Sequence, residues 1–364
     1  MAGFAATCAL AHPGLTDDKV VQHTAHHAMG DAATAFLATL DDDQRKLLVT
    51  TLDDEAARTD WSNLPSSMYP RTGLPLSALD DRQRIAFHNL MAAAMSGQGY
   101  AEATTIMWID DLLRGIESER LAKGEVPEDR RAQAEAVMQS RGSGNYWLRF
   151  FGEPASARWG WMINGHHFAA SFTVVDGRIA FTPLFLGSNP QIVQSGPYAG
   201  WRVLDHEMVD GFALFASLDA VQRATALVGP EVTADIFTGK GAKDAPRAAL
   251  GLSADHMTPD QRERLMELIA DFVGFANNDA AKAQLAAVRA DGPANIRLAW
   301  WGSPDDRGKR FMYRIASPSI LIEYTREGQP DGSPSNHVHA IVRDPRNDYG
   351  EDWLRRHYTE APHP

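Results

Sequence analysis

The spacing of apolar residues changes near Gly142, and this change constrains the fold more than any other feature of the chain. Before it, across about 17–58 and 77–117, apolar residues recur every three or four positions, which predicts amphipathic helices. After it, short runs rich in aromatic and β-branched residues predict strands with short connections, and these favour antiparallel pairing. We therefore expect an α+β protein with helices packed around a curved antiparallel sheet.

Turn and capping residues divide these stretches into elements. Asp41 and Asp80 stand where helices are expected to begin, because an aspartate accepts the free amide hydrogens of a first helical turn. The pair Asp176-Gly177 predicts a hairpin between the runs 158–175 and 178–182. Further strands are expected at 146–151, 296–301, 311–315, 320–324 and 337–342.

The expected elements form one domain spanning 1–364. A mainly helical layer occupies 1–140, and the sheet occupies 141–364 with inserted helices at 204–228 and 259–289. We find no internal repeat and no low-complexity segment in the sequence.

Charge and cysteine content exclude several classes of protein. The net charge is -12 and basic residues form no run longer than two, so nucleic acid is not expected as a partner. The single cysteine, Cys8, allows no intrachain disulfide and no thiolate cluster. Any metal site must therefore use His, Asp and Glu side chains.

Only general features of the sequence bear on cellular location and oligomeric state. No stretch approaches the roughly 18 apolar residues of a membrane span, so no membrane partner is expected. The opening Gly3–Ala11 is apolar but short and lacks a basic region, so we expect a cytoplasmic protein without a secretion signal. A homo-oligomer is compatible with the sequence.

His337 and His339 are the most informative pair of residues. They are two apart in an expected strand, so both imidazoles project from one face and are close enough to share an ion. A solvated strand face explains a lone His-x-His about equally well. Glu323 ends the preceding strand, and a hairpin joining the two strands would bring its carboxylate to the imidazoles as a third ligand. The alternative for Glu323 is a surface salt bridge with Arg326 or Arg343.

His166 and His167 compete for a further coordination position. In a regular strand, neighbours face opposite sides, so only one of them can ligate unless a bulge at Gly165 bends the chain. The apolar pattern does not choose between them.

Other residues could hold the substrate beside the ion. Arg343 follows the His-x-His strand and could bind a carboxylate or phosphate through both guanidinium nitrogens, or could instead pair with Asp344 or Asp348. We also expect Arg343 and Glu323 to take part in catalysis. Arg71, in the Pro- and Gly-rich loop 61–73, and Trp161 complete the substrate residues, although strand tryptophans are more often part of the core.

Several short motifs resemble one known family, the bacterial proteins catalogued as domain of unknown function 3500. The resemblance covers nearly the whole chain and implies one unit, but it implies no reaction. It is carried by Trp159-Gly160-Trp161, Gly165-His166-His167, Thr182–Pro190, Gly196–Gly200, Ile322-Glu323-Tyr324, Asn336–His339, Arg343-Asp344-Pro345 and Asn347–Gly350.

These residues lead to three hypotheses about function. The first is a metal-dependent hydrolase that acts on a small, anionic organic substrate through a metal-activated water, with zinc as the favoured ion. The second is an oxidoreductase or oxygenase that uses iron or copper in the same His-rich site. The third is a non-catalytic protein that binds a small ligand and keeps a structural metal. No P-loop, H-E-x-x-H or Gly-x-Ser-x-Gly motif supports another class.

Overall fold

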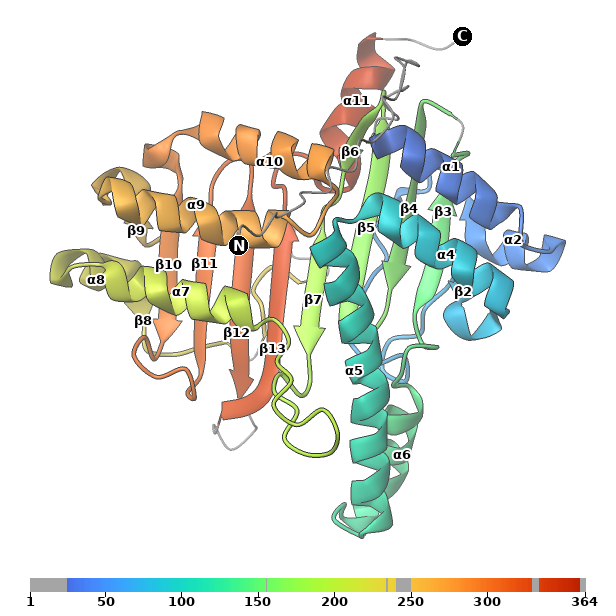
Figure 1. Cartoon of the computed structure of the whole chain (residues 1–364), viewed down its shortest axis with the longest axis horizontal. Coiled ribbons are helices and arrows are strands. Elements are labelled where there is room, and N and C mark those ends of the chain that lie inside the picture. Colours follow the sequence, from blue (N-terminus) through green and yellow to red (C-terminus); the bar gives the residue numbers. More distant parts are fainter. Residues whose placement is uncertain (1–24, 155, 234, 240–249, 329–333, 361–364) are drawn as a thin grey trace, which may run out of the picture.

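A single large sheet runs through the middle of the molecule (Figure 1). The computed structural model describes residues 25–154, 156–233, 235–239, 250–328 and 334–360. The opening Gly3–Ala11 and Cys8 lie outside these residues. None of the described helices is both long and apolar enough to cross a membrane.

All thirteen described strands belong to this sheet. Its main path has the order β1-β3-β4-β5-β7-β13-β12-β11-β10-β8, with β2, β6 and β9 paired at its sides. The strands are β1 (Val49–Thr50), β2 (Leu74–Pro75), β3 (Trp147–Phe151), β4 (Arg158–Asn164), β5 (Phe168–Val175), β6 (Arg178–Ala180), β7 (Leu184–Ser188), β8 (Leu227–Gly229), β9 (Leu252–Ser253), β10 (Arg297–Gly302), β11 (Phe311–Ala316), β12 (Leu321–Gly328) and β13 (Pro334–Arg343).

The protein is α+β, as the sequence predicted. Pairing is antiparallel except at the two edges, where β1 joins β3 and β8 joins β10 in parallel. The helices are α1 (Ala25–Leu37), α2 (Asp42–Leu48), α3 (Glu55–Arg58), α4 (Asp81–Ala94), α5 (Gly97–Ala122), α6 (Arg131–Gln139), α7 (Asp205–Ser217), α8 (Ala220–Ala226), α9 (Pro259–Val273), α10 (Asn278–Asp291) and α11 (Glu351–Glu360), with short 3-10 turns at 76–78, 128–130, 254–256, 293–295 and 348–350.

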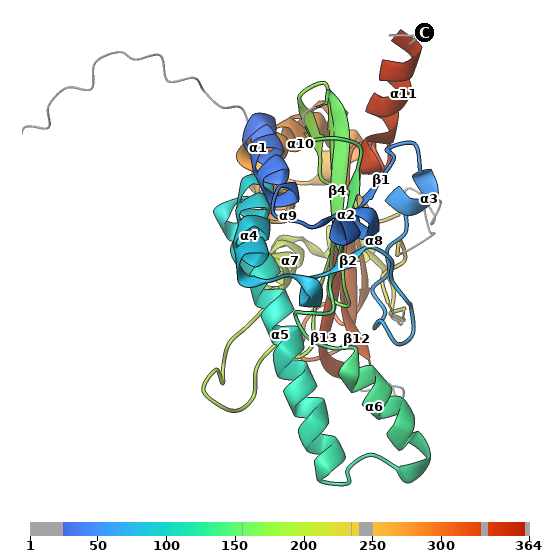
Figure 2. The ribbon, with the colours of Figure 1, turned by 90° about the vertical axis from the view of Figure 1, so that its right-hand side faces the viewer.

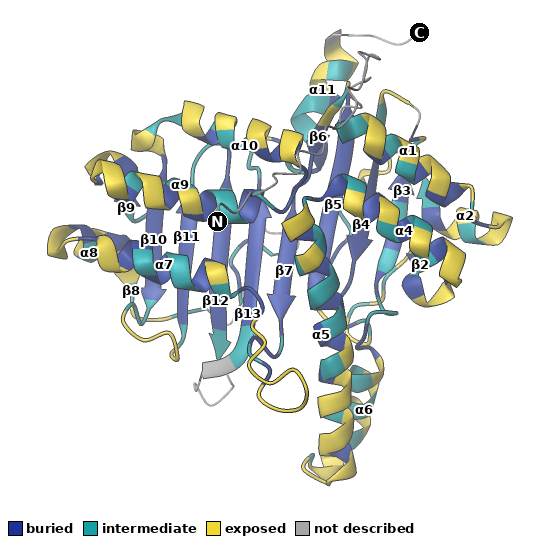
Figure 3. Ribbon diagram, viewed as in Figure 1, coloured by how far each residue is buried: buried dark blue, intermediate teal, exposed yellow. Residues whose placement is uncertain are grey.

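The two faces of the sheet are covered differently. Helices α1, α4, α5, α7 and α9 lie on one face, whereas α3, α11 and irregular segments lie on the other (Figure 2). The strands at the centre are buried on both faces, while the helices expose their outer sides (Figure 3). Along β13, Val338 and Ala340 pack into the large helix-covered core, and Ile341 packs into the smaller core opposite. His337 and His339 therefore face the side without the long helices.

The predicted helix starts are confirmed at two positions. Asp41 and Asp80 each accept a hydrogen bond from the backbone N–H of a glutamine three residues later, and that glutamine returns a bond to the cap. Such reciprocal boxes satisfy two otherwise free amide groups at a helix start.

One predicted strand is divided in two. The run 158–175 forms β4 and β5, which pair antiparallel around a turn at Gly165-His166-His167. The turn at Asp176-Gly177 exists and joins β5 to β6, with positive φ at both residues. The histidine pair therefore lies in a turn and not within a strand.

The chain contains an internal repeat, so the sequence-based statement that none exists is wrong. Apart from α3 and α6, which lie in the first set without a counterpart, the element order α1-α2-β1-β2-α4-α5-β3-β4-β5 recurs as α7-α8-β8-β9-α9-α10-β10-β11-β12. Figure 1 shows the two sets on opposite sides of the sheet centre, with α4 on one side and α9 on the other. An isolated β-bridge joins Met95 of the first half to Ala276 of the second. Each of these residues lies just before the second long helix of its half, α5 or α10.

The repeat is also present in the residues. Leu40-Asp41 and Gln44-Arg45 recur 178 positions later as Leu218-Asp219 and Gln222-Arg223. The same offset relates Gly73-Leu74 to Gly251-Leu252, and Gln83-Arg84 to Gln261-Arg262. The offset persists across the intervening loops, which indicates a duplicated unit and not a chance match of short motifs.

The repeated glutamines make the same contacts in each half. Gln44 and Gln83 join their amide groups at 2.8–3.0 Å, and Gln222 and Gln261 do so at 2.9–3.0 Å. Each pair links the starts of a short and a long helix. Because buried amides need partners, this paired contact holds the two helices of each half in register.

Candidate metal centre

The turn between β4 and β5 requires glycine at its first residue. A Cβ on Gly165 would lie 2.0 Å from the ring of Tyr146, so no other residue fits there. The chain reverses direction at this point, and the imidazoles of His166 and His167 lie with centroids 3.5 Å apart and planes tilted by 39°. Both rings are buried, and they lie on the same side of the chain and not on opposite sides.

His167, His337 and His339 lie together. Ligand atoms of the three fall within 4.8 Å of one another. The Nε2 atoms of His167 and His337 are 3.0 Å apart. Nitrogens that each lie about 2 Å from one tetrahedral zinc are about 3.3 Å apart, so this spacing suits a shared ion.

Gly187 provides the space in which these imidazoles meet. It pairs with His339 across β7 and β13, and its N–H donates to the carbonyl of His167 at 2.7 Å. A Cβ there would lie 2.8 Å from Cδ2 of His339 and 2.9 Å from Cδ2 of His167. Any larger residue would separate the two rings.

Glu327 fixes the orientation of two of the three histidines. One carboxylate oxygen lies 2.7 Å from Nδ1 of His337, and the other lies 2.7 Å from Nδ1 of His339. Each Nδ1 therefore carries the proton that it donates, and Nε2 is the nitrogen that can take a second proton or an ion. This pairing of carboxylate and imidazole is typical of the outer sphere of metal sites, where it sets the tautomer and raises ligand basicity.

Among the described residues, no side chain outside the cluster contacts the Nε2 atoms. Nε2 of His339 is buried without a hydrogen bond among the described residues. The facing lone pairs of His167 and His337 repel unless a proton or a cation lies between them. An ion bound by all three Nε2 atoms would satisfy the whole group.

The charges around the site favour a cation. Burial lowers the pKa of His339, but the carboxylates of Asp235 and Glu327 outweigh it and raise that pKa to about 10. Burial raises the pKa of Glu327, yet His339 and His337 hold it well below its usual range. Burial and neighbouring histidines keep the pKa of His167 well below 6.5. In the free protein a proton on His339 thus occupies the position that a metal ion would take.

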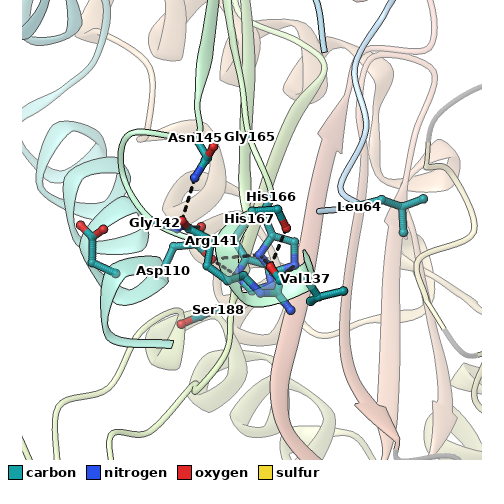
Figure 4. A network of polar contacts seen from close by, with 12 residues as sticks. Leu64, Asp110, Val137, Arg141, Gly142, Asn145, Gly165, His166, His167 and Ser188 are labelled. Carbon is teal, nitrogen blue, oxygen red and sulfur yellow. Dashed lines mark hydrogen bonds and ion pairs between the residues drawn. The ribbon is translucent and has the colours of Figure 1, made fainter. Parts of the chain in front are cut away.

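A second group, formed by Asp110, His166 and His167, is less suited to an ion. Figure 4 shows Asp110 and Arg141 beside the two imidazoles. Asp110 lies 3.0 Å from Nδ1 of His166 and accepts the N–H of Gly142 at 2.9 Å. Nη1 of Arg141 lies 2.7 Å and 2.5 Å from the two ring nitrogens of His166. A guanidinium at this distance repels a cation, so His167 is better placed than His166 to hold one.

Asp110 positions the turn from the helix α5. Its counterpart in the second repeat is Asp291, near the end of α10, which accepts from Ser317 and Ser319 in the turn between β11 and β12. The two aspartates hold equivalent turns, but the second turn carries serines where the first carries histidines. The histidine turn therefore occurs in only one half of the duplicated fold.

A third group, formed by Asp235, Glu327 and His339, shares a residue with the first. Asp235 lies 2.8 Å from Nδ1 of His339. An ion held there would occupy the side of the imidazole that faces the carboxylates, and Nε2 of His339 would stay unpartnered. We therefore assign Asp235 and Glu327 to the support of the three-histidine site.

Solvent reaches the cluster over its acidic rim. The side chain of Asp235 is 39% exposed and those of His337 and Glu327 are 16% and 15% exposed, whereas His167 is fully buried. Among the described residues, the site is therefore closed at His167 and partly exposed at Asp235, His337 and Glu327.

Glu323 lies elsewhere than the sequence suggested. Its carboxylate accepts from Nε of Arg314 at 2.8 Å and from Thr238 at 2.9 and 3.0 Å, and it is fully buried. The β12 carboxylate that contacts the imidazoles is that of Glu327, four residues further along the strand. The register of β12 against β13 decides this, because Thr325 lies opposite His339 and Glu323 lies opposite Ile341.

Arg343 and Arg71 are already used within the protein. Arg343 donates to Asp348 at 2.7 Å and to the carbonyl of Thr238 at 2.9 Å. Arg71 donates to Asn164 and to the carbonyls of Ser62, Leu64 and Gly165, so it ties the loop 61–73 to the histidine turn.

Trp161 lies in the core. It stacks on Phe172 at 4.8 Å and is fully buried on the helix-covered face. The two arginines and Trp161 therefore support the fold in this structure.

Sequence reasoning missed three residues of the site. Glu327 carried a usable signal, since it lies in the same strand as Glu323 and only the register separates them. Asp110 and Asp235 carried none, because one lies within a helix and the other within an irregular segment.

The chain belongs to the family described as protein of unknown function, DUF3500, whose model matches residues 22–351. This confirms the resemblance seen in its motifs. Neither the comparison with curated proteins nor that with solved structures finds a match.

Proposed function

We propose that the protein is a metalloenzyme in which Nε2 atoms of His167, His337 and His339 hold one divalent ion, with zinc favoured. The observation that carries this proposal is the bidentate role of Glu327, which accepts hydrogen bonds from the Nδ1–H groups of both β13 histidines and so turns their Nε2 atoms towards His167. A neutral set of three imidazoles with supporting carboxylates is the ligand set of several hydrolytic or hydrating zinc sites.

The partial exposure of Asp235, His337 and Glu327 supports a catalytic ion over a structural one. Structural zinc is normally closed by four protein ligands, whereas catalytic zinc keeps a position for water. Such an ion lowers the pKa of its bound water to about 7 and so supplies hydroxide at neutral pH. We propose hydrolysis of a small organic substrate as the reaction.

The protein residues would serve the reaction by orientation and by charge. Asp235 and Glu327 hold His339, and Asp110 holds the turn of His167, so the three nitrogens keep one geometry. Because Arg71 and Arg343 are bound internally, an anionic substrate would depend on the ion itself for its charge partner.

The absence of a carboxylate from the proposed ligand set weakens the iron alternative. Non-haem iron oxygenases commonly use two histidines and one carboxylate, and here both nearby carboxylates contact the Nδ1 side of the imidazoles. Copper stays an alternative ion for the same three nitrogens.

Elemental analysis of the purified protein tests the ion, and hydrolysis of 4-nitrophenyl acetate tests the chemistry. We expect about one zinc per chain and a hydrolysis rate that rises through an apparent pKa near about 7. The double variant His337→Ala/His339→Ala should lose both, whereas His256→Ala, at an exposed position, should lose neither. Equal metal content in the double variant and the parent would refute the site, and equal turnover with the metal lost would refute its role in catalysis.

A further inference from the structure

Two connections of the duplicated fold meet beside the three histidines. The connection 51–73 joins β1 to β2 in the first half, and the connection 230–251 joins β8 to β9 in the second. Trp61 of the first connection and Ile236 of the second pack into the same small core, on the face of the sheet without the long helices. Equivalent segments of the two halves therefore come together at this point.

A hydrogen bond between Asn63 and Asp235 joins the two connections. Nδ2 of Asn63 donates to Oδ2 of Asp235 at 2.7 Å. The other carboxylate oxygen, Oδ1, lies 2.8 Å from Nδ1 of His339 and accepts from the backbone N–H of Ile236 at 2.7 Å. Both oxygens of Asp235 are thus engaged, and this fixes the rotation of its carboxylate beside His339.

Arg71 holds the backbone on both sides of Asn63. Its Nη2 atom donates to the carbonyls of Ser62 and Leu64, at 2.5 and 2.6 Å. The same nitrogen lies 3.0 Å from the carbonyl of Gly165, in the turn that carries His167. The position of Asn63 is therefore set by the histidine turn itself.

These contacts link the two sides of the three-histidine site. They run from the turn of His167 through Arg71 and Asn63 to Asp235, and from there to His339 on β13. The side chain of Asp235 is 39% exposed, and within the described part of the chain Asn63 supplies the one hydrogen bond to its Oδ2. Without that bond the carboxylate could turn into water, because an exposed side chain gains rotational freedom when it is released.

We propose that Asn63 is a positioning residue of the metal centre, which acts through Asp235 on His339. Its amide keeps the carboxylate of Asp235 against Nδ1 of His339, so that Nε2 of His339 stays directed at the ion. The site is then complete only when the connections of both halves are in place. This inference rests on the proposed metal site and adds a residue that does not touch the ion.

Zinc affinity, measured by competition with a chromophoric chelator, tests the proposal. Asn63→Ala should lower it about fivefold, less than the roughly 10- to 100-fold that loss of a partner in direct contact with a ligand costs. Asn63→Asp keeps the shape but places a second carboxylate beside Asp235, so its loss should be larger. Met68→Ala, at a 57% exposed position of the same connection, is the control and should keep the parent affinity. Parent affinity in Asn63→Ala would overturn the proposal.

A double-mutant cycle with Asp235→Asn tests whether Asn63 acts through Asp235. In the Asp235→Asn background, Asn63→Ala should lower zinc affinity by less than about twofold, because the residue through which it acts is already altered. The same fivefold loss in both backgrounds would show that Asn63 acts by another route, and would overturn the proposal.

Long-range proton–nitrogen NMR correlation of the imidazoles in the metal-free, full-length chain separates this role from the metal site. Asn63→Ala should shift the Nδ1 resonance of His339, whose hydrogen bond to Asp235 it disturbs, and leave the signals of the exposed His256 unchanged. A parent protein that binds no zinc would refute the proposed function. An unshifted His339 signal would overturn the role of Asn63, whether or not zinc binds.

Discussion

His167 and His337 place their Nε2 atoms 3.0 Å apart although 170 residues separate them in the chain. The contact joins a turn of the first repeat to a strand beside β12 of the second, and it forms at the centre of the sheet where β7 meets β13. Two imidazole nitrogens with facing lone pairs need a cation or a proton between them, and the surrounding carboxylates favour that positive charge.

Replacing Glu327 should weaken metal binding without removing a ligand. Glu327→Gln keeps the size of the side chain but cannot accept from both Nδ1 atoms as a carboxylate does. We expect zinc affinity, measured by competition with a chromophoric chelator, to fall about 10- to 100-fold.

Glu323→Gln is the matched control on the same strand. It leaves Arg314 without its buried carboxylate, so we expect a loss of about 3 kcal/mol in the free energy of unfolding. Zinc affinity should stay at the parent value. A larger loss of affinity in Glu323→Gln than in Glu327→Gln would mean that the ligand shell is assigned to the wrong carboxylate.

Asp110→Asn should lower zinc affinity about tenfold, because Asp110 holds the turn that carries His167. Isothermal titration calorimetry measures the change. Asp291→Asn alters the equivalent turn of the second repeat, where no histidine lies, and should reduce thermal stability only. If the two variants bind zinc equally well, Asp110 has no part in the site.

The two glutamine pairs predict equal and additive effects on stability. Gln83→Ala and Gln261→Ala each remove a buried amide and leave its partner unsatisfied, so each should cost about 1–3 kcal/mol in urea unfolding. The double variant should lose the sum to within about 0.5 kcal/mol, because the pairs lie in separate halves. Gln139→Ala, at an exposed helix position, serves as control. Costs that differ severalfold between the two single variants would contradict the structural equivalence of the halves.

Asp271 should make stability depend on pH. Burial and the carboxylates of Asp210 and Glu207 raise its pKa to about 6, from 3.8. The folded chain holds this proton more tightly than the unfolded chain, so its contribution to stability is complete below about pH 4 and is lost as pH rises through about 6.

Asp271→Asn removes this dependence. We expect the variant to gain about 1 kcal/mol over the parent at pH 7.5, a value reduced for the partial exposure of the group, and to gain nothing at pH 4. Thermal unfolding at the two pH values measures it. A gain of the same size at pH 4 would assign the effect to packing and not to ionisation.

Part of the fold and of the site followed from the sequence because it depends on local pattern. The caps at Asp41 and Asp80 are local, and so is the spacing of His337 and His339. The sequence alone could not indicate which of His166 and His167 is better placed to hold an ion. That depends on the turn that Gly165 makes against Tyr146 and on the position of Arg141. These are contacts between distant segments.

The internal repeat escaped sequence inspection because so few residues preserve it. The shared residues are mostly those with a geometric role, such as the capping glutamines and the glycines with positive φ. The strands kept their pairing while most of their side chains changed. Searching for one constant offset, here 178, would have found the duplication.

The most direct test of the metal centre is anomalous scattering from a crystal of the zinc-loaded protein, measured on both sides of the zinc absorption edge. We predict one strong peak about 2 Å from the Nε2 atoms of His167, His337 and His339. A peak between Asp235 and Glu327, or none within reach of the three imidazoles, would contradict the assignment.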